Sequence, residues 1–310
     1  MNPAGLIAGQ SVRLALRDRT VVLMMAMFAL MVLLSAWLGW QATTTVDRIY
    51  TDAAAFLASA GKAVPGNPVL DRSPLTLMRN LSVYVTLLGA LSAIVIGNQL
   101  VASDRAAGVM PLIGSRLSGR FGYANGKVTA LAGLAAGLVG GAALVSAATL
   151  AVLPAIVVTH AQWLHLAEFF ALSAIYMMIF GLIALWSAAI SPAQSVGLLI
   201  PVALWLTITF ILPALTLNLT PTAVLNPISA LATPPDSGFF RGTGWLLGPL
   251  SLTEIYGATA AGLLDFRPLD WVARSMLPAA LSLGLWLALC LTLALRALAN
   301  LSLATGCHDE

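Results

Sequence analysis

The sequence predicts an all-α integral membrane protein with six transmembrane helices. Of its 310 residues, 59% are hydrophobic and only 9% are charged, whereas soluble chains carry about 25% charged residues. The mean hydropathy is +0.93. Uncharged apolar runs recur along the chain, each at least as long as the roughly 20 residues that cross a bilayer core. These observations exclude a soluble globular domain, and the net charge of +3 reflects membrane orientation rather than nucleic-acid binding.

Residues 1–20 are predicted to form an amphipathic elbow helix on the cytoplasmic side. Arg13 and Arg17 are four residues apart and therefore share one helical face. A basic amphipathic helix directly before a span is expected to lie in the membrane interface. A simple positively charged flank would explain the charges equally well. The first apolar run is too long for the core of a cleavable signal peptide, so we expect it to remain as a span.

The first two spans are predicted at Val21 to Trp40 and at Leu81 to Val101, with a polar loop between them. A short surface helix at Thr51 to Lys62 is compatible with the composition of that loop. The first span contains Met24, Met25, Met27 and Met31. Thioether ligands could pass a soft metal such as Cu(I), but methionine also fills irregular apolar gaps, and we favour the second interpretation.

A polar connector, Ser103 to Lys127, follows the second span. Its basic residues are Arg105, Arg116, Arg120 and Lys127. Short loops rich in Lys and Arg remain on the cytoplasmic side. An acidic-to-glycine turn from Asp104 to Gly108 leads into an apolar piece, Val109 to Ile113. This order predicts a small cytoplasmic helix lying across the entrance to the next span.

The third span, Val128 to Val158, is free of charge for 31 residues, so we expect it to tilt, bend or project past the bilayer. It contains Gly133, Gly137 and Gly141. Small residues at this spacing let another helix approach closely. The loop after this span contains His160, His165 and Glu168. These residue types can bind a metal, but we favour a solvated loop and predict no metal site.

The remaining spans are predicted at Phe169 to Ile190, Val196 to Leu215 and Met276 to Leu295. Before the last span lie two half-length apolar pieces, residues 221–232 and 244–264. Pieces of this length are more often re-entrant or interfacial than spanning. An even number of spans places both termini on the cytoplasmic side together with the connector.

Several kinds of chemistry are absent from the sequence. No charged residue lies deep in the six predicted spans, which disfavours an ion-coupled carrier, with Glu254 in the second half-length piece as the one reservation. Gly126-Lys127 is not a Walker A motif, because Phe121 stands where the first glycine would fall. We find no catalytic triad or metalloprotease motif. The chain is therefore expected to have neither a cofactor nor an enzymatic activity of its own.

Three features together resemble the membrane subunits of bacterial type-2 ABC exporters. The first is the basic elbow ending in Leu16-Arg17-Asp18-Arg19. The second is the connector, with Asp104-Arg105-Ala106-Ala107-Gly108, Ser115-Arg116-Leu117-Ser118-Gly119-Arg120 and Gly126-Lys127. The third is the broken apolar pair containing Leu225-Asn226-Pro227. Asp104 stands where the family usually has Glu, and Leu117 stands where it usually has Pro.

The resemblance implies a permease subunit in the bacterial inner membrane. It would pair with a second permease copy, as a homodimer or with a paralogue, and with two copies of a separate ATPase that binds ATP and Mg. The ATPase would dock on the elbow and on a coupling helix in the connector. The residues that the resemblance assigns to this coupling are Arg13, Arg17, Asp104, Arg105, Gly108, Arg116, Arg120 and Lys127.

Other functions remain open at this point. The permease could serve a periplasmic copper or sulfur maturation system, and its outer loops could receive a periplasmic protein. The connector arginines could instead only fix the topology or bind anionic lipid headgroups. A membrane scaffold without transport activity and an ion-coupled secondary transporter are alternatives of another class. Dependence on an ATPase distinguishes the permease from both.

Overall fold

The computed structural model describes residues 3–64, 66–67, 73–110, 121–152, 158–217, 237–266 and 277–301. All regular structure in these residues is helical. Six helical stretches are long and apolar enough to cross a membrane, namely Arg19–Ser59, Pro74–Ala106, Gly122–Val152, His160–Ile190, Gln194–Thr216 and Ala279–Asn300. The prediction of an all-α membrane protein with six spans is confirmed.

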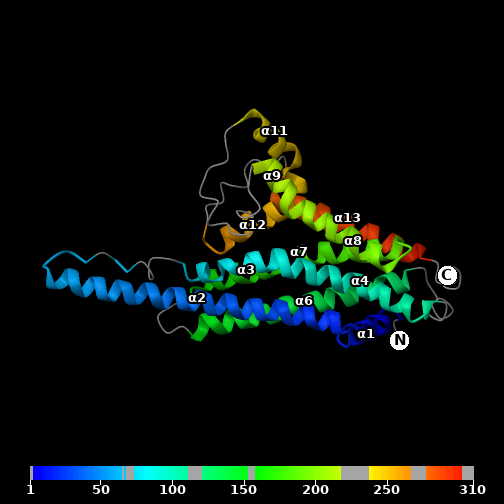
Figure 1. Ribbon diagram of the computed structural model, residues 1–310, viewed down its shortest axis with the longest axis horizontal. Helices are drawn as coiled ribbons and strands as arrows, with labels where there is room; N and C mark the ends of the chain where they lie inside the picture. Colours follow the sequence, from blue (N-terminus) through cyan, green and yellow to red (C-terminus); the bar gives the residue numbers. More distant parts are fainter. Residues whose placement is uncertain are drawn as a thin grey trace.

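Helix α1 (Pro3–Ala15) precedes the long helix α2 (Arg19–Ser59). Asp18 caps α2, because its carboxylate accepts hydrogen bonds from the backbone N–H groups of Thr20 and Val21. With 41 residues and about 1.5 Å per residue, α2 is about twice as long as the hydrocarbon core is thick. Figure 1 shows its C-terminal half reaching past the rest of the molecule.

The prediction that a polar loop begins directly after Trp40 is wrong over the first part of that loop, because α2 continues as one helix to Ser59. Likewise, the short helix predicted from Thr51 is not separate but belongs to α2. No Gly or Pro occurs between Gly39 and Gly61, so nothing in the chain breaks the helix where it leaves the apolar run.

Two of the spans contain a π-helical segment. The second span consists of η1 (Pro74–Met78), α3 (Arg79–Tyr84), the π segment η2 (Val85–Gly89) and α4 (Ala90–Ala106). The fifth consists of α8 (Gln194–Leu206), the π segment η3 (Thr207–Ile211) and α9 (Leu212–Leu217). The Trp205 indole N–H donates to the Thr86 carbonyl at 3.1 Å, which joins the two irregular regions.

Helix α7 (His160–Ile190) is the central element. It packs against α4, α6 (Gly122–Val152), α8 and α13 (Ala279–Asn300). Gly97 and Gly181 make this packing possible, because a Cβ on Gly97 would collide with the Gly181 carbonyl and a Cβ on Gly181 would lie 2.8 Å from a Leu131 methyl. The buried core therefore follows α7 along its length.

The helices α11 (Gly238–Leu247) and α12 (Leu252–Leu263) lie together with α9 at the end opposite α1. The turn η4 (Gly248–Leu250) separates them. The predicted piece 244–264 therefore corresponds to the last turn of α11, the turn η4 and all of α12, and α11 begins earlier than predicted, at Gly238. The first predicted piece, 221–232, lies outside the described residues. Helix α1 and the C-terminal end of α13 lie at the same end of the molecule (Figure 1).

Candidate functional site

A buried polar cluster joins α1, α4 and α6, and we call Ser11, Asp104, Tyr123 and Lys127 the α1 joint. The Lys127 ammonium lies 2.6 Å from Asp104 Oδ2, donates to Ser11 Oγ at 2.9 Å and lies 5.3 Å from the centre of the Tyr123 ring. The Tyr123 hydroxyl donates to Asp104 Oδ2 at 2.9 Å. Because Lys127 is only 1% exposed, each charge depends on the other for its stability.

Gly126 explains how α1 reaches this position. A Cβ on Gly126 would lie 2.7 Å from Ile7 Cγ2 and 3.1 Å from the Ala4 carbonyl oxygen. Only glycine therefore admits α1 against α6 at this distance, and the next residue, Lys127, then bonds to Ser11 of α1. The Gly126-Lys127 pair fixes the N-terminal helix to the third span.

The residues after Asp104 form a C-terminal helix cap. Gly108 has φ +64°, the Gly108 N–H donates to the Arg105 carbonyl at 3.0 Å, and the Val109 N–H donates to the Asp104 carbonyl at 3.3 Å. These two bonds with a left-handed glycine are a Schellman motif. The predicted acidic-to-glycine turn is therefore the end of α4, and its geometry fixes the direction in which the connector leaves.

Arg105 binds within the chain. Its guanidinium donates to the carbonyl of Ser191 at 2.7 Å and to that of Ala189 at 2.8 Å. These carbonyls belong to the C-terminal end of α7, where unpaired acceptors and the helix dipole favour a cation. Arg105 thus attaches the end of α4 to the end of the central helix.

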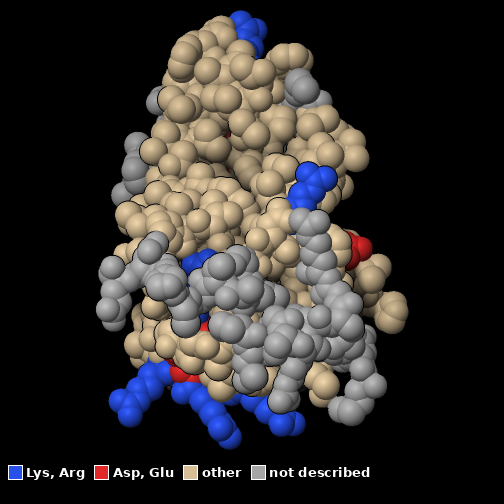
Figure 2. Space-filling view, turned by 90° about the vertical axis from the view of Figure 1, so that its right-hand side faces the viewer, with Lys and Arg blue, Asp and Glu red and all other residues tan. Residues whose placement is uncertain are grey.

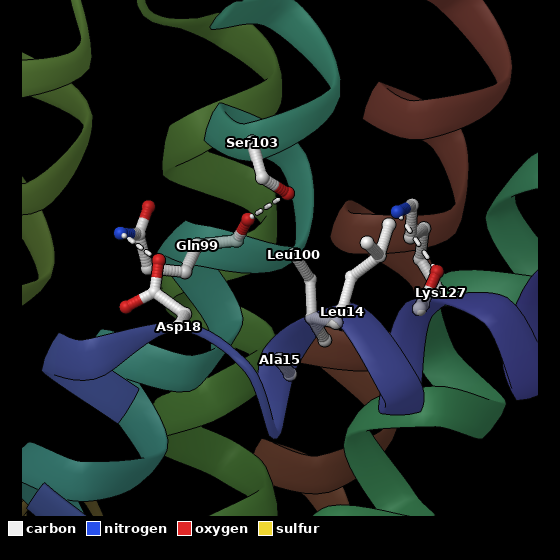
Figure 3. Close-up of a pocket in the computed structure, with 8 residues that line it drawn as sticks. Leu14, Ala15, Asp18, Gln99, Leu100, Ser103 and Lys127 are labelled. Atoms are coloured by element: carbon white, nitrogen blue, oxygen red, sulfur yellow. Dashed lines mark hydrogen bonds between the residues drawn. The ribbon is translucent and has the colours of Figure 1, made fainter. Parts of the chain in front are cut away.

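A second chain of hydrogen bonds leads from the start of α2 to α8. Gln99 donates to Asp18 Oδ2 at 3.1 Å, and Gln194 donates to Gln99 Oε1 at 3.4 Å. A small cavity of about 30 Å³ lies between α1 and α4. Figure 3 shows Asp18, Gln99 and Lys127 among the residues that line it. A space of this size holds a water molecule or two and no substrate. This region is a joint between helices rather than a binding pocket.

Exposed arginines surround the joint on the outside. Arg13, Arg17 and Arg19 are exposed, and no ion pair joins them to the described part of the chain. Figure 2 views this end of the molecule and shows basic side chains projecting from its lower edge, where Figure 1 places α1. Arg116 and Arg120 lie outside the described residues.

The predicted coupling residues thus fall into two sets. Asp104, Arg105 and Lys127 make contacts inside the chain, whereas Arg13 and Arg17 point outward. The resemblance assigns all of them to coupling with the ATPase, and spacing along the sequence does not show which of these charges are buried. A buried lysine could have been suspected from Gly126-Lys127, since a glycine at a helix contact places its neighbour near the contact.

The three glycines of the predicted packing ladder lie on the exposed face of α6. Gly133, Gly137 and Gly141 have no heavy atom within 4 Å of an added Cβ. Gly137 and Gly141 instead line an apolar groove of about 450 Å³ between α2 and α6. No described helix of this chain packs on the ladder, so its use by another helix stays a prediction.

A buried hydroxyl cluster that the sequence analysis does not predict lies between the middle of α7, α12 and η3. The Tyr176 and Tyr256 rings lie 4.6 Å apart. The Tyr256 hydroxyl bonds to Ser173 at 2.9 Å, the Tyr176 hydroxyl bonds to Thr253 at 3.0 Å, and Thr253 donates to Thr209 at 3.3 Å. The signal for this cluster would have been Ser and Tyr three residues apart within the apolar fourth span.

Glu254 lies next to this cluster on α12. The Thr216 hydroxyl donates to Glu254 Oε2 at 2.8 Å. Burial raises the pKa of this carboxyl above its ordinary value, and the hydrogen bond from Thr216 partly offsets the rise. Glu254 therefore has a hydroxyl partner but no cationic one among the described residues.

The described residues contain no group of three or more His, Cys, Asp or Glu side chains that could hold a metal ion. The prediction that His160, His165 and Glu168 lie in a loop is wrong, because Thr159 and Gln162 form a capping box that starts α7 at His160 and all three residues lie in its first turns. No family model and no curated protein matches this chain. Fold and site together define a multi-pass helical membrane protein in which a buried ion pair joins the second span to the third and the lysine of that pair donates to Ser11 of the N-terminal helix.

Proposed function

We propose that this chain is the transmembrane permease subunit of an ATP-binding-cassette transporter of the inner membrane. It moves or extracts a substrate with ATP, held with Mg, that a separate ATPase subunit hydrolyses. The observation that carries the proposal is the α1 joint, which fixes a helix with outward arginines to the third span through Lys127. Such a joint would transmit a displacement of α1 directly to the second and third spans.

The division of the basic residues supports this proposal. To transmit force, the protein needs an exposed surface that contacts the ATPase and a rigid attachment of that surface to the membrane helices. Arg13 and Arg17 provide exposed charges for an acidic groove on an ATPase. Lys127 and Arg105 provide the attachment, to α1 and to the end of α7 respectively.

A membrane scaffold would need no such coupling between an exposed helix and the bundle, and an ion-coupled carrier would need a titratable group on its pathway. The only ion pair among the described residues lies at the α1 end. Glu254, at the far end, is bonded to Thr216. The permease therefore accounts for more of the structure than either alternative.

The test is purification of the full chain from native membranes in mild detergent, followed by identification and assay of any ATPase that accompanies it. Arg13→Glu combined with Arg17→Glu is expected to release the ATPase and its vanadate-sensitive activity. The matched control is Arg48→Glu, an exposed arginine at the other end of α2, which should retain both. Absence of any ATP-binding chain with the unaltered protein would refute the proposal and favour a scaffold or a gradient-driven carrier.

A further inference from the structure

The outer half of α2 carries an apolar stripe that no described part of this chain covers. Ala42, Val46, Ile49, Ala53 and Phe56 lie three or four residues apart and so share one helical face; we call them the outer stripe. Ile49 is 63% exposed and Phe56 is 72% exposed. These residues lie beyond Trp40, where about twenty residues from Val21 have already crossed the bilayer core. Large apolar side chains are therefore presented to water.

The other faces of this half of α2 differ in chemistry. One is turned toward the returning chain, where Asn67 donates to Asp47 at 3.0 Å and Tyr50 is half-buried. The face opposite the outer stripe is exposed and mostly polar, with Thr51 near its centre. The helix is thus amphipathic outside the membrane, and its apolar face has no partner among the described residues of this chain. A helix of this length standing alone in water would be marginally stable.

The outer stripe continues into the membrane. Leu38, four residues before Ala42, lies at the membrane end of this face and is 49% exposed. A partner that covers the whole face must therefore extend continuously from the membrane into the water outside it. A soluble protein would cover only the outer portion, and lipid would cover only the inner portion.

A second copy of α2 meets both requirements. Two copies inserted in one bilayer have parallel α2 helices at the same depth, and a two-fold axis between them brings each residue opposite its own counterpart. The spacing from Ala42 to Phe56 alternates four, three, four and three residues, which is the heptad pattern of parallel paired helices. Val46, Ile49 and Phe56 would each face their own counterpart in the second copy and supply the apolar contact area, and Ala42 and Ala53 leave the backbones room to approach.

We infer that two copies of this chain pair through the outer stripe, forming a parallel two-helix stalk that projects from the membrane. This inference deepens the proposed function, which requires two permease copies, by naming the surface that joins them. It involves only the end of α2 away from the α1 joint.

Disulfide cross-linking in native membranes tests the stalk. The background is the full chain with Cys290→Ala and Cys307→Ser, which removes both cysteines. Single cysteines are placed in the outer stripe (Val46→Cys, Ile49→Cys, Phe56→Cys), and two controls are placed on the opposite exposed face (Thr51→Cys, Ala58→Cys). Because a disulfide needs Cα atoms within about 7 Å, we expect the stripe positions to form dimers at least about tenfold faster than the controls.

Equal rates at all five positions, or no dimer at the stripe positions, would overturn the stalk, as would cross-linking of the stripe only to a different protein. Ile49→Glu with Phe56→Glu provides a second readout. It should reduce co-purification of two differently tagged copies, and Thr51→Glu with Ala58→Glu should not. The ATPase is measured in the same preparations. If the ATPase co-purifies but the stripe cysteines do not cross-link, the stalk is refuted and the proposed function stands. If the stripe cysteines cross-link but no ATPase co-purifies, the proposed function is refuted and the stalk stands.

Discussion

At the scale of single residues, the main finding is where the polar side chains of the connector lie. Asp104 and Lys127 are 23 positions apart, and the sequence contains no sign that they meet. In the structure they form a buried ion pair that Ser11 and Tyr123 complete. Burial of a charge depends on the packing of three helices, which hydropathy and spacing along one helix cannot supply. The charged residues of the connector can be found in the sequence, but the sequence does not show that Asp104 and Lys127 bind each other inside the protein.

Lys127→Met should strongly destabilise the protein, because it leaves the Asp104 carboxylate buried without its cation. The expected loss is about 3–5 kcal/mol of unfolding free energy, seen as a lower thermal transition of the purified protein. Asp104→Leu together with Lys127→Met removes both charges and should recover most of this loss. If the double variant is as unstable as the single one, the joint is not held by its ion pair.

Gly126→Ala should loosen α1, because its methyl would lie 2.7 Å from Ile7 Cγ2. Such a forced contact costs about 1–3 kcal/mol and should make the α1–α2 junction more susceptible to limited proteolysis. Gly133→Ala is the matched control on the same helix, since its methyl would meet nothing within 4 Å. That variant should be neutral or slightly stabilising, because alanine favours the helix by about 1 kcal/mol over glycine. Equal proteolysis of both variants would contradict the close approach of α1.

At the scale of whole elements, the number and class of helices could be predicted, but some of their ends could not. Uncharged runs locate six spans because hydropathy measures the cost of placing each residue in lipid. Hydropathy does not show where a helix ends in water. The apolar run ends near Trp40, whereas α2 continues to Ser59. Hydropathy does not show the π segments at Val85–Gly89 and Thr207–Ile211 either; in the first of them the Thr86 carbonyl accepts a hydrogen bond from Trp205 of the fifth span.

The packing of α12 against α9 should depend on pH through Glu254. Because burial raises the pKa of this carboxyl in the folded state, the folded protein binds its proton more tightly than the unfolded chain does. Stability should therefore fall as the pH rises above about 4.5, the ordinary value, up to the raised value, by about 1.4 kcal/mol for each unit of pKa difference.

Thermal transitions recorded across this pH range should show the decrease for the unaltered protein and a flatter profile for Glu254→Gln. The amide can still accept a hydrogen bond from Thr216 but does not titrate. Thr259→Val, a change on the same helix away from the carboxyl, serves as the control and should keep the pH dependence. A Glu254→Gln profile that falls as steeply as that of the unaltered protein would assign the effect to other groups.

At the scale of the whole molecule, the structure separates two ends with different properties. The α1 end holds the buried joint and the exposed arginines Arg13, Arg17 and Arg19. The opposite end holds the projecting half of α2 and the cap of α9, α11 and α12. Proposed coupling and proposed pairing therefore lie at opposite ends of the same helix, α2, whose first residues are capped by Asp18 next to the joint.

This arrangement requires that the α1 end faces the cytoplasm, as the excess of basic residues in short segments predicts. Intact cells with the outer membrane made permeable are labelled with a membrane-impermeant maleimide, in the background lacking Cys290 and Cys307. Ala58→Cys should react directly, because it is exposed on the projecting half of α2. Gln10→Cys, exposed on α1, should react only after the inner membrane is disrupted. The reverse pattern would place α1 outside, where no ATPase could reach it, and the coupling role of the α1 joint would fail with it.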